Sequence, residues 1–297
     1  MLPPFPPDDE RLRTVREALP AVGAGIYLDT ATAGPLPSET SAAMAELAGW
    51  EGRTGRAGAA FLEETAARLD EARAAVAAIL TADVDEIAVT TSAAASVAAA
   101  AASVPWRPGD AVVTIGLEHA PALAPLVGLA RALGLRTATV PLGGSLDALA
   151  AFDAAIVDGV RLVAVPHVSA ATGELVPLAG IAALARARGA AVIVDGSQAA
   201  GAIPVDVPGL GVDFYAVTGE TWLLGPGGVG ALWVGDGTPA ERFDAGGWYR
   251  PAVLGLGRSI GWLSMYVGLE WLQRRAADLV AALLPRLEAI DGVEVLT

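Results

Sequence analysis

The chain has 297 residues and a formal net charge of −14 at pH 7, from 33 acidic and 19 basic side chains. This balance argues against nucleic acid and anionic membranes as partners, because phosphate groups are bound by basic surfaces. Cysteine is absent, which excludes disulfides, thiolate nucleophiles and zinc–thiolate sites. All 19 basic residues are arginine, so no side chain carries a primary amine.

Composition also bears on the cellular location. Hydrophobic residues make up 54% of the chain, much of it alanine. No apolar run reaches the roughly 18–20 residues of a membrane span. The N-terminus, MLPPFPPDDERLR, has prolines and acids where a signal peptide has basic residues and an apolar stretch. We therefore expect a soluble, cytoplasmic protein.

The first elements are mainly helical. A short helix is predicted near residues 9–19, within a proline-rich lead-in. The segment IYLDTATAGPLP, residues 26–37, predicts a short strand and a turn of small residues. Ser38 is then a good N-cap for a helix that continues to residue 50. Apolar residues at helical spacing predict one long helix over 57–80.

From residue 87 to residue 234, short apolar strands alternate with helices. The strands are predicted at residues 87–91, 111–115, 136–140, 161–165, 190–194, 212–217 and 229–234. This alternation predicts an α/β fold with a mainly parallel sheet covered by helices on both faces. The first turn lacks the G-x-G pattern of dinucleotide-binding folds, which disfavours that alternative.

Several of these strands are followed by residues able to bind a ligand. Ser92 begins an alanine-rich helix, whose first N–H groups and dipole favour an anion. Two readings of this turn, a phosphate cup or a plain N-capped helix, are equally supported. His119 and Asp195 each come just after a strand. The segment from Thr218 to Trp222 also follows a strand, and ligands of α/β sheets commonly bind there.

The segment DFYAVTGETWLLGPGGVGALWV, residues 213–234, resembles the cofactor-lysine segment S-G-x-K-W-x-x-G-P-x-G-x-G of class V aminotransferases and cysteine desulfurases. Other motifs of that family follow in the same order, so that the resemblance covers about residues 26–297. They are YLDTATAGPLP near the N-terminus, the Ser92 turn, Glu118–His119, PHVSAATGELVP from Pro166, DGSQ from Asp195 and RFDAGG from Arg242.

The resemblance implies a pyridoxal phosphate (PLP) protein of fold type I. It implies that His119 stacks on the cofactor ring and that Asp195 pairs with the ring nitrogen, which makes the ring an electron sink. The cofactor-binding residues that it implies are Ser92, Ala93, Ala94, His119, Thr172, Asp195, Gln198 and Thr218. The family is usually dimeric and acts on amino acids or related amines, and no metal is implied.

The central chemical group of that family is missing, because Thr221 holds the lysine position. A Schiff base needs a primary amine on a flexible stem, and arginine does not supply one. Ala93, Ala170 and Gly247 also replace residues that bind the cofactor in the family. A covalent link to PLP is therefore excluded.

Two interpretations remain for an enzyme-like site. The protein binds PLP or its aminated form without a covalent link, with Glu220 or His119 as the base near Thr221, or it is a degenerate member that keeps only the fold. The combined losses favour the second. A non-catalytic partner or regulatory subunit on the same dimeric fold is the alternative from another class. Nothing in the sequence supports a cofactor-independent enzyme.

The resemblance also predicts the domain organisation. We expect a lead-in over residues 1–25 and a large α/β domain over 26–240. Residues 241–297 are expected to hold a linking helix, from residue 259 to about 290, and the start of a truncated small C-terminal domain.

Overall fold

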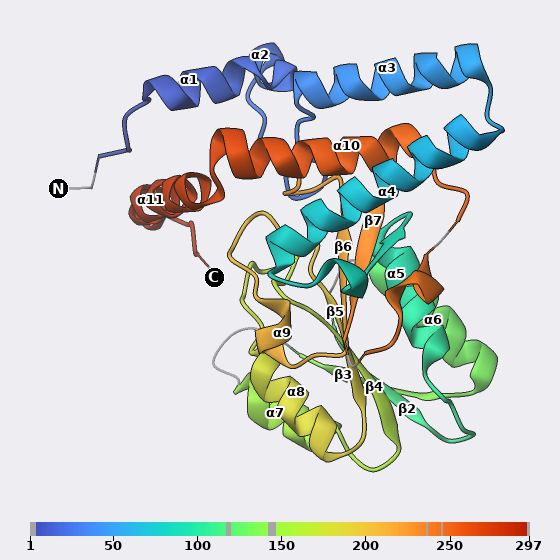
Figure 1. Ribbon diagram of the computed structural model, residues 1–297. Helices are drawn as coiled ribbons and strands as arrows, with labels where there is room; N and C mark the ends of the chain where they lie inside the picture. Colours follow the sequence, from blue (N-terminus) through green and yellow to red (C-terminus); the bar gives the residue numbers. More distant parts are fainter. Residues whose placement is uncertain (1–3, 117–119, 142–146, 236, 245, 296–297) are drawn as a thin grey trace.

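The computed structural model describes residues 4–116, 120–141, 147–235, 237–244 and 246–295. Its centre is a seven-stranded sheet in the order β1-β7-β6-β5-β4-β2-β3 (Figure 1). The strands are β1 Ile87–Thr90, β2 Ala111–Ile115, β3 Arg136–Val140, β4 Val160–Pro166, β5 Ala191–Asp195, β6 Phe214–Thr218 and β7 Gly230–Val234. Only β7 runs against its neighbours. The predicted mainly parallel α/β sheet is confirmed.

Helices lie on both faces of this sheet. The helices of the described residues are α1 Glu10–Glu17, α2 Pro20–Ala24, α3 Ser38–Thr54, α4 Ala59–Leu80, α5 Ala93–Ser103, α6 Ala120–Leu133, α7 Ala148–Ala155, α8 Leu178–Ala187, α9 Val207–Leu210, α10 Arg250–Gly261 and α11 Leu269–Glu288. Short 3-10 turns occupy Val84–Glu86 and Ala240–Phe243. In Figure 1, α1, α3, α10 and α4 form a layer beyond one end of the strands.

Two hydrophobic cores explain why the central strands are mainly apolar. Successive strand residues point to opposite faces, so Val163 and Val194 belong to the core on the face covered by α7 and α8, and this core continues to α4 and α10. Leu162 and Ile193 pack on the other face with α5 and α6. Burial on both faces is typical of parallel strands, and the edge strand β3, with the sequence RTATV, is the largely exposed exception.

The strand predicted within residues 26–37 is wrong. Ile26 and Leu28 are 91% and 90% exposed, and the segment pairs with no strand among the described residues. Its hydrogen bonds go instead to a distant turn, through Gly34 N–H to the Glu220 carbonyl. Ser38 is the first residue of α3 rather than its cap, and its hydroxyl donates to the Ala18 carbonyl.

The single long helix predicted from residue 259 is also wrong. Helix α10 begins at Arg250 and continues as a π-helical turn, Trp262–Val267. Gly268, at φ 81°, ends it, and α11 leaves at an angle of 76°. A positive φ suits glycine and interrupts a right-handed helix. In the described part of the chain no single helix meets the length and hydropathy of a membrane span, although this bent pair does so by length and composition.

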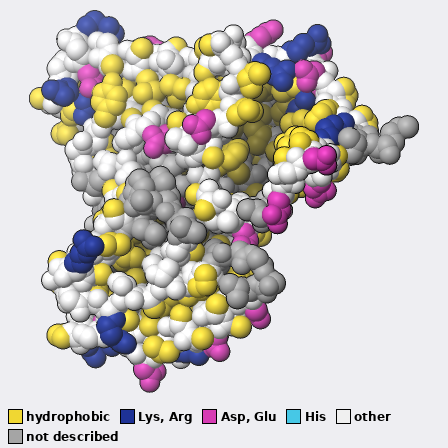
Figure 2. Space-filling view, turned by 180° about the vertical axis from the view of Figure 1, so that it is seen from behind, with side chains coloured by type: hydrophobic (Ala, Val, Ile, Leu, Met, Phe, Trp, Pro, Cys, Tyr) yellow, Lys and Arg dark blue, Asp and Glu magenta, His cyan; other side chains and the backbone are white. Residues whose placement is uncertain are grey.

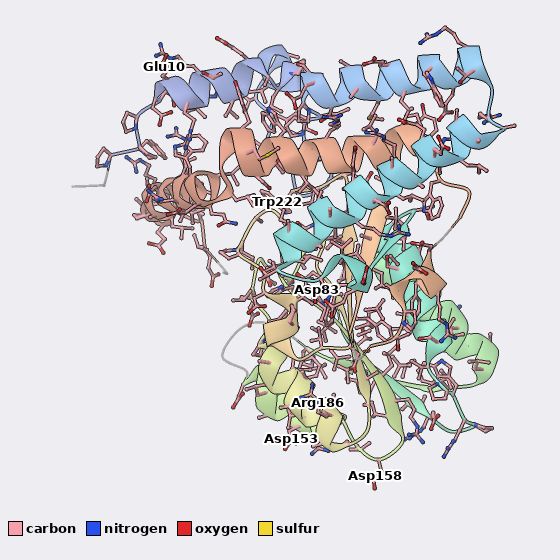
Figure 3. All side chains as sticks on the ribbon, viewed as in Figure 1. Glu10, Asp83, Asp153, Asp158, Arg186 and Trp222 are labelled. Carbon is pink, nitrogen blue, oxygen red and sulfur yellow. The ribbon has the colours of Figure 1, made fainter. Side chains whose placement is uncertain are left out.

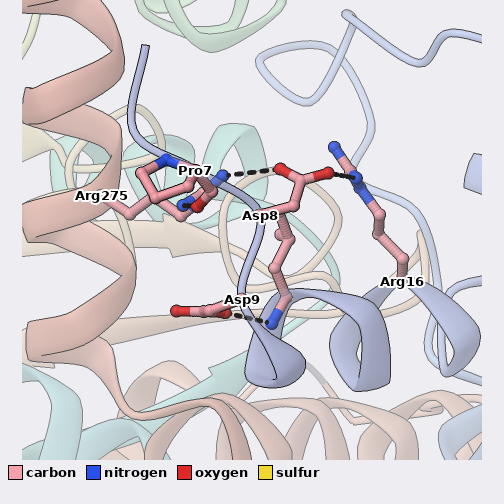
Figure 4. Close-up of polar contacts among 6 residues, drawn as sticks. Pro7, Asp8, Asp9, Arg16 and Arg275 are labelled. Atoms are coloured by element: carbon pink, nitrogen blue, oxygen red, sulfur yellow. Dashed lines mark hydrogen bonds and ion pairs between the residues drawn. The ribbon is translucent and has the colours of Figure 1, made fainter. Parts of the chain in front are cut away.

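The N-terminal residues lie across α11, far from them in sequence. The Asp8 carboxylate binds Arg16 at 2.7 Å and Arg275 at 3.1 Å (Figure 4). Arg275 also donates to the Pro7 carbonyl, and the Arg11 guanidinium lies 5.5 Å from the centre of the Trp271 ring. These contacts fix the start of the chain against the helix that follows the break.

The carboxylate of Asp244 anchors the edge strand β1. It accepts from Val89 N–H and pairs with Arg73, and both charged side chains are largely buried. Replacing Asp244 with Ala leaves Arg73 and Val89 N–H without these bonds, and should lower the free energy of unfolding by about 3 kcal/mol in urea denaturation. The control is Glu270→Ala, in the exposed Arg274 pair, which should cost less than about 1 kcal/mol. Equal effects would contradict this assignment.

Candidate functional site

Three parallel strands bring their carboxyl ends to one edge of the sheet. Pro166 pairs with Asp195, and Asp195 pairs with Ala216, so His167, Asp195 and Thr218 end neighbouring strands. Figure 3 shows Trp222 at this end, next to the helix layer, while Asp153, Asp158 and Arg186 lie at the opposite end. Among the described residues, His167, Asp195 and Thr218 therefore lie at one edge of the sheet.

Asp195 is held by the residue two positions further along. Its Oδ1 accepts from both Ser197 N–H at 3.0 Å and the Ser197 hydroxyl at 2.6 Å. The other oxygen, Oδ2, accepts no hydrogen bond from the described residues. An aspartate so fixed can present one oxygen to a protonated ring nitrogen or another cationic donor.

Thr221, at the lysine position, is buried and is used within the protein. Its hydroxyl donates to the Ser197 carbonyl at 2.7 Å. The neighbouring Trp222 indole donates to Gln198 Oε1 at 2.8 Å, and Gln198 Nε2 donates to the Ala31 carbonyl at 2.9 Å. The structure thus brings Thr221 and Asp195 together, but it engages both polar ends of Gln198 in other contacts.

The N-terminus of α5 lies beside the same edge. Thr90 and Thr218 both pair with Gly230 of β7, and a Cβ on Gly230 would press on the Ser92 backbone. The Ser92 hydroxyl caps the helix by accepting from Ala95 N–H at 3.1 Å. The N–H groups of the first helical residues, Ala93 and Ala94, have no acceptor within the helix and suit an anion.

Thr172 lies in a tight turn after β4. The Thr172 N–H donates to the Ser169 hydroxyl at 3.2 Å, and Glu174 N–H donates to the Thr172 hydroxyl at 3.3 Å. Gly173, at φ 76°, completes the turn. The polar groups of Thr172 thus form hydrogen bonds that stabilise this turn in the absence of a ligand.

Glu220 and His119 are the remaining residues of the predicted site. Glu220 is half-buried, and its carbonyl accepts from Gly34 N–H. His119 lies outside the described residues. Within the described part of the chain, no group of three or more His, Asp or Glu side chains forms a metal site.

The sequence analysis did not identify the buried contact between His167 and Tyr215. His167 Nδ1 lies 2.8 Å from the Tyr215 hydroxyl, and the rings meet edge to face. Burial lowers the pKa of His167, and burial together with the charge of Asp195 raises that of Tyr215. A Cβ on Gly196 would overlap with the Tyr215 ring. Tyr215 was missed because it lies within a continuous apolar strand.

The depressed pKa of His167 predicts a pH effect on stability. The folded protein keeps this imidazole neutral, whereas the unfolded chain binds a proton below its usual pKa of 6.5. Its contribution is therefore complete above that pH and is lost as the pH falls below it. The free energy of unfolding of His167→Gln should fall less than that of wild type between about pH 7 and pH 5, measured by denaturation at each pH. Parallel curves would contradict a neutral buried imidazole.

Comparisons with known proteins agree with this architecture. The family model of class V aminotransferases matches residues 26–297. Probable cysteine desulfurases from Xylella fastidiosa and Methanothermobacter thermautotrophicus are similar. The first is 31% identical over 98% of this chain and 78% of the relative, and the second 29% identical over 96% and 78%.

Two solved structures share the fold. A lysine-to-alanine mutant of C-DES, with glycine covalently linked to its PLP cofactor, has a TM-score of 0.87 and 23% identity, over 96% of this chain and 81% of the other. The apo cysteine desulfurase from Thermococcus onnurineus NA1 has a TM-score of 0.79 and 27% identity, over 93% and 76%. The predicted fold type I architecture is confirmed. The chain belongs to the class V aminotransferase family, among its cysteine desulfurase-like members.

Proposed function

We propose that this chain is a class V protein that binds PLP, or its aminated form, reversibly and has lost the covalent chemistry of its family. One observation carries the proposal. At the lysine position the Thr221 hydroxyl donates to the Ser197 carbonyl, and no lysine exists elsewhere in the chain. Neither a threonine hydroxyl nor an arginine guanidinium replaces the primary amine that forms the covalent link.

The retained groups fit a non-covalently held cofactor. Oδ2 of Asp195 is the acceptor for the ring nitrogen, and the N–H groups of Ala93 and Ala94 are the donors for the phosphate. A bound PLP ring serves as an electron sink for amino acids or related amines. The chain's own groups would bind and orient that ring, while Thr221 provides no amine to receive or return the substrate.

Other features weaken binding without abolishing it. The Ser92 hydroxyl already accepts a hydrogen bond as the cap of α5, and the Gln198 side chain is hydrogen-bonded to Ala31 and Trp222. Gly247 has no hydroxyl with which to reach a phosphate. These losses support reversible binding rather than the tight retention expected of a covalently linked cofactor.

The C-DES mutant offers a parallel for this proposal. That protein carries glycine covalently linked to PLP although one of its lysines is changed to alanine. A protein of this fold can thus hold the cofactor together with an amino acid while a lysine is missing. We propose the same class of ligand here, with an amino acid or related amine as the small-molecule partner.

The proposal predicts how cofactor attachment responds to a restored amine. Wild-type protein should bind PLP in equilibrium dialysis, lose it on dilution and give no covalent adduct at internal residues after borohydride reduction. Thr221→Lys should give an adduct at the new amine, because position 221 lies beside the Asp195 strand end. Intact mass and peptide mapping measure both results.

Matched variants distinguish the outcomes. Thr221→Arg adds length and charge without a primary amine, so it should give no adduct. Asp195→Asn should weaken wild-type binding by roughly tenfold, the effect of losing one charge-assisted hydrogen bond. Asp153→Asn, at the opposite end of the sheet, should not change it. A folded Thr221→Lys that takes up no cofactor would contradict a retained site.

A second candidate, a non-catalytic partner or regulatory subunit in a cytoplasmic dimer, is favoured by exposed apolar side chains. Met265 is 86% exposed and Tyr266 50%, in addition to Ile26 and Leu28. Figure 2 shows hydrophobic side chains spread over the upper part of the molecule. Exposed apolar surface of this kind commonly marks a protein interface.

Light scattering tests the partner role. The chain should form a dimer alone or a mixed dimer with a lysine-bearing class V relative, and Met265→Glu should shift the mass towards a monomer because it buries a charge. The control is Leu62→Glu, an exposed leucine in α4 away from these residues. A monomeric mass for wild type in both preparations would contradict this candidate.

A further inference from the structure

We infer that Thr221 is a positioning residue: it holds the Ser197 turn, and through Ser197 it fixes the carboxylate of Asp195. The residue at the family's lysine position has thereby taken a structural task in the same site. This inference rests on the proposed function only in giving Asp195 a ligand to meet, and the hydrogen bonds themselves are independent of it.

Three consecutive hydrogen bonds carry the inference. The Thr221 hydroxyl donates to the Ser197 carbonyl at 2.7 Å, and Ser197 donates twice to Asp195 Oδ1. Thr221 and Ser197 are 5% and 8% exposed, so water has little access to replace the bond between them. Because Oδ1 receives both Ser197 donors, the orientation of the Asp195 carboxylate follows the position of Ser197.

A second link joins the same two segments. Trp222 donates to Gln198, and Gln198 donates to Ala31. Two adjacent positions are therefore bonded: the Thr221 hydroxyl to the Ser197 carbonyl, and the Trp222 indole to the Gln198 side-chain amide. Two bonds in sequence resist rotation of the turn, which a single bond would permit.

The segment that bears Thr221 is held by further contacts. Leu224 adopts φ 51°, in the left-handed region that leucine seldom occupies, and its carbonyl accepts from the buried Ser259 hydroxyl. Ser259 in turn contacts the Thr40 hydroxyl at 3.0 Å. A Cβ on Gly34 would overlap with the Thr221 carbonyl and the Leu224 side chain. These contacts hold the backbone at Thr221 in place relative to α3 and α10.

The Asp195 turn also packs against Tyr215. Tyr215 lies against Gly196, where a Cβ would overlap with its ring, and His167 binds the Tyr215 hydroxyl. The turn is therefore in contact with both Tyr215, at Gly196, and Thr221, at Ser197. Loss of the Thr221 hydroxyl removes the polar contact on one side and leaves a buried carbonyl of Ser197 without its donor.

The test compares variants of nearly equal volume in the protein without cofactor. Thr221→Val removes the donor and keeps the shape, whereas Thr221→Ser keeps the donor. Exchange of the Ser197 amide with deuterium reports the bond to Asp195. Thr221→Val should speed this exchange by roughly fivefold, the equivalent of one net hydrogen bond, and Thr221→Ser should leave it near the wild-type rate. Thr65→Val is the matched control, since it removes a half-buried threonine hydroxyl that donates to the Phe61 carbonyl within α4 and takes no part in the support of Thr221.

A second measurement separates this inference from the proposed function. With PLP as the probe, Thr221→Val and Ser197→Ala should each weaken binding several-fold, and the double variant should be no weaker than the stronger single effect. If wild type binds no PLP, the proposed function fails while the exchange rates still decide the role of Thr221. Unchanged Ser197 exchange in Thr221→Val overturns the inference. If Thr221→Val does not fold, unchanged PLP binding by folded Ser197→Ala overturns it instead.

Discussion

The candidate site depends on the parallel register of β4, β5 and β6. Pro166 lies opposite Asp195, and Asp195 opposite Ala216, so three strands end together and deliver their following turns to one edge. The backbone ladder fixes these positions to within a residue, because a slip by one residue would turn every side chain to the other face. The positions of the polar turns are therefore set by the register of the buried strands that precede them.

Much of this arrangement was predictable from the sequence. Mainly apolar runs such as residues 111–115 and 190–194 identify strands to within a residue of the observed bounds, because both faces of these strands are largely buried. The ends of those runs then locate Asp195 and Ser92. The Ile26 and Leu28 segment was misjudged because a strand requires a neighbouring edge, which local sequence does not reveal. The break at Gly268 was missed because the helical spacing of apolar residues continues across it. The positive φ of this glycine, which ends the helix, is not visible in that spacing.

The finer contacts of the site follow from tertiary packing and lay beyond sequence reasoning. D-x-S is a common turn pattern, and it hints that Ser197 returns to Asp195. Nothing near Gln198 indicates that its amide reaches Ala31, more than 160 residues earlier in the chain. Nor does the sequence around Thr221 indicate its acceptor. Such bonds depend on how two turns that are distant in the sequence pack against each other in the folded chain.

The site separates two tasks that one active centre usually combines. Holding a planar, charged ring needs a fixed carboxylate and an anion-binding helix end, and both are built from backbone and short side chains. Covalent attachment needs one long, flexible amine, and a chain whose basic residues are all arginine lacks it. A short hydroxyl at position 221 reaches only the next turn, at 2.7 Å. Position 221 therefore contributes a hydrogen bond within the protein, to the residue that binds the Asp195 carboxylate, and offers no amine for attachment.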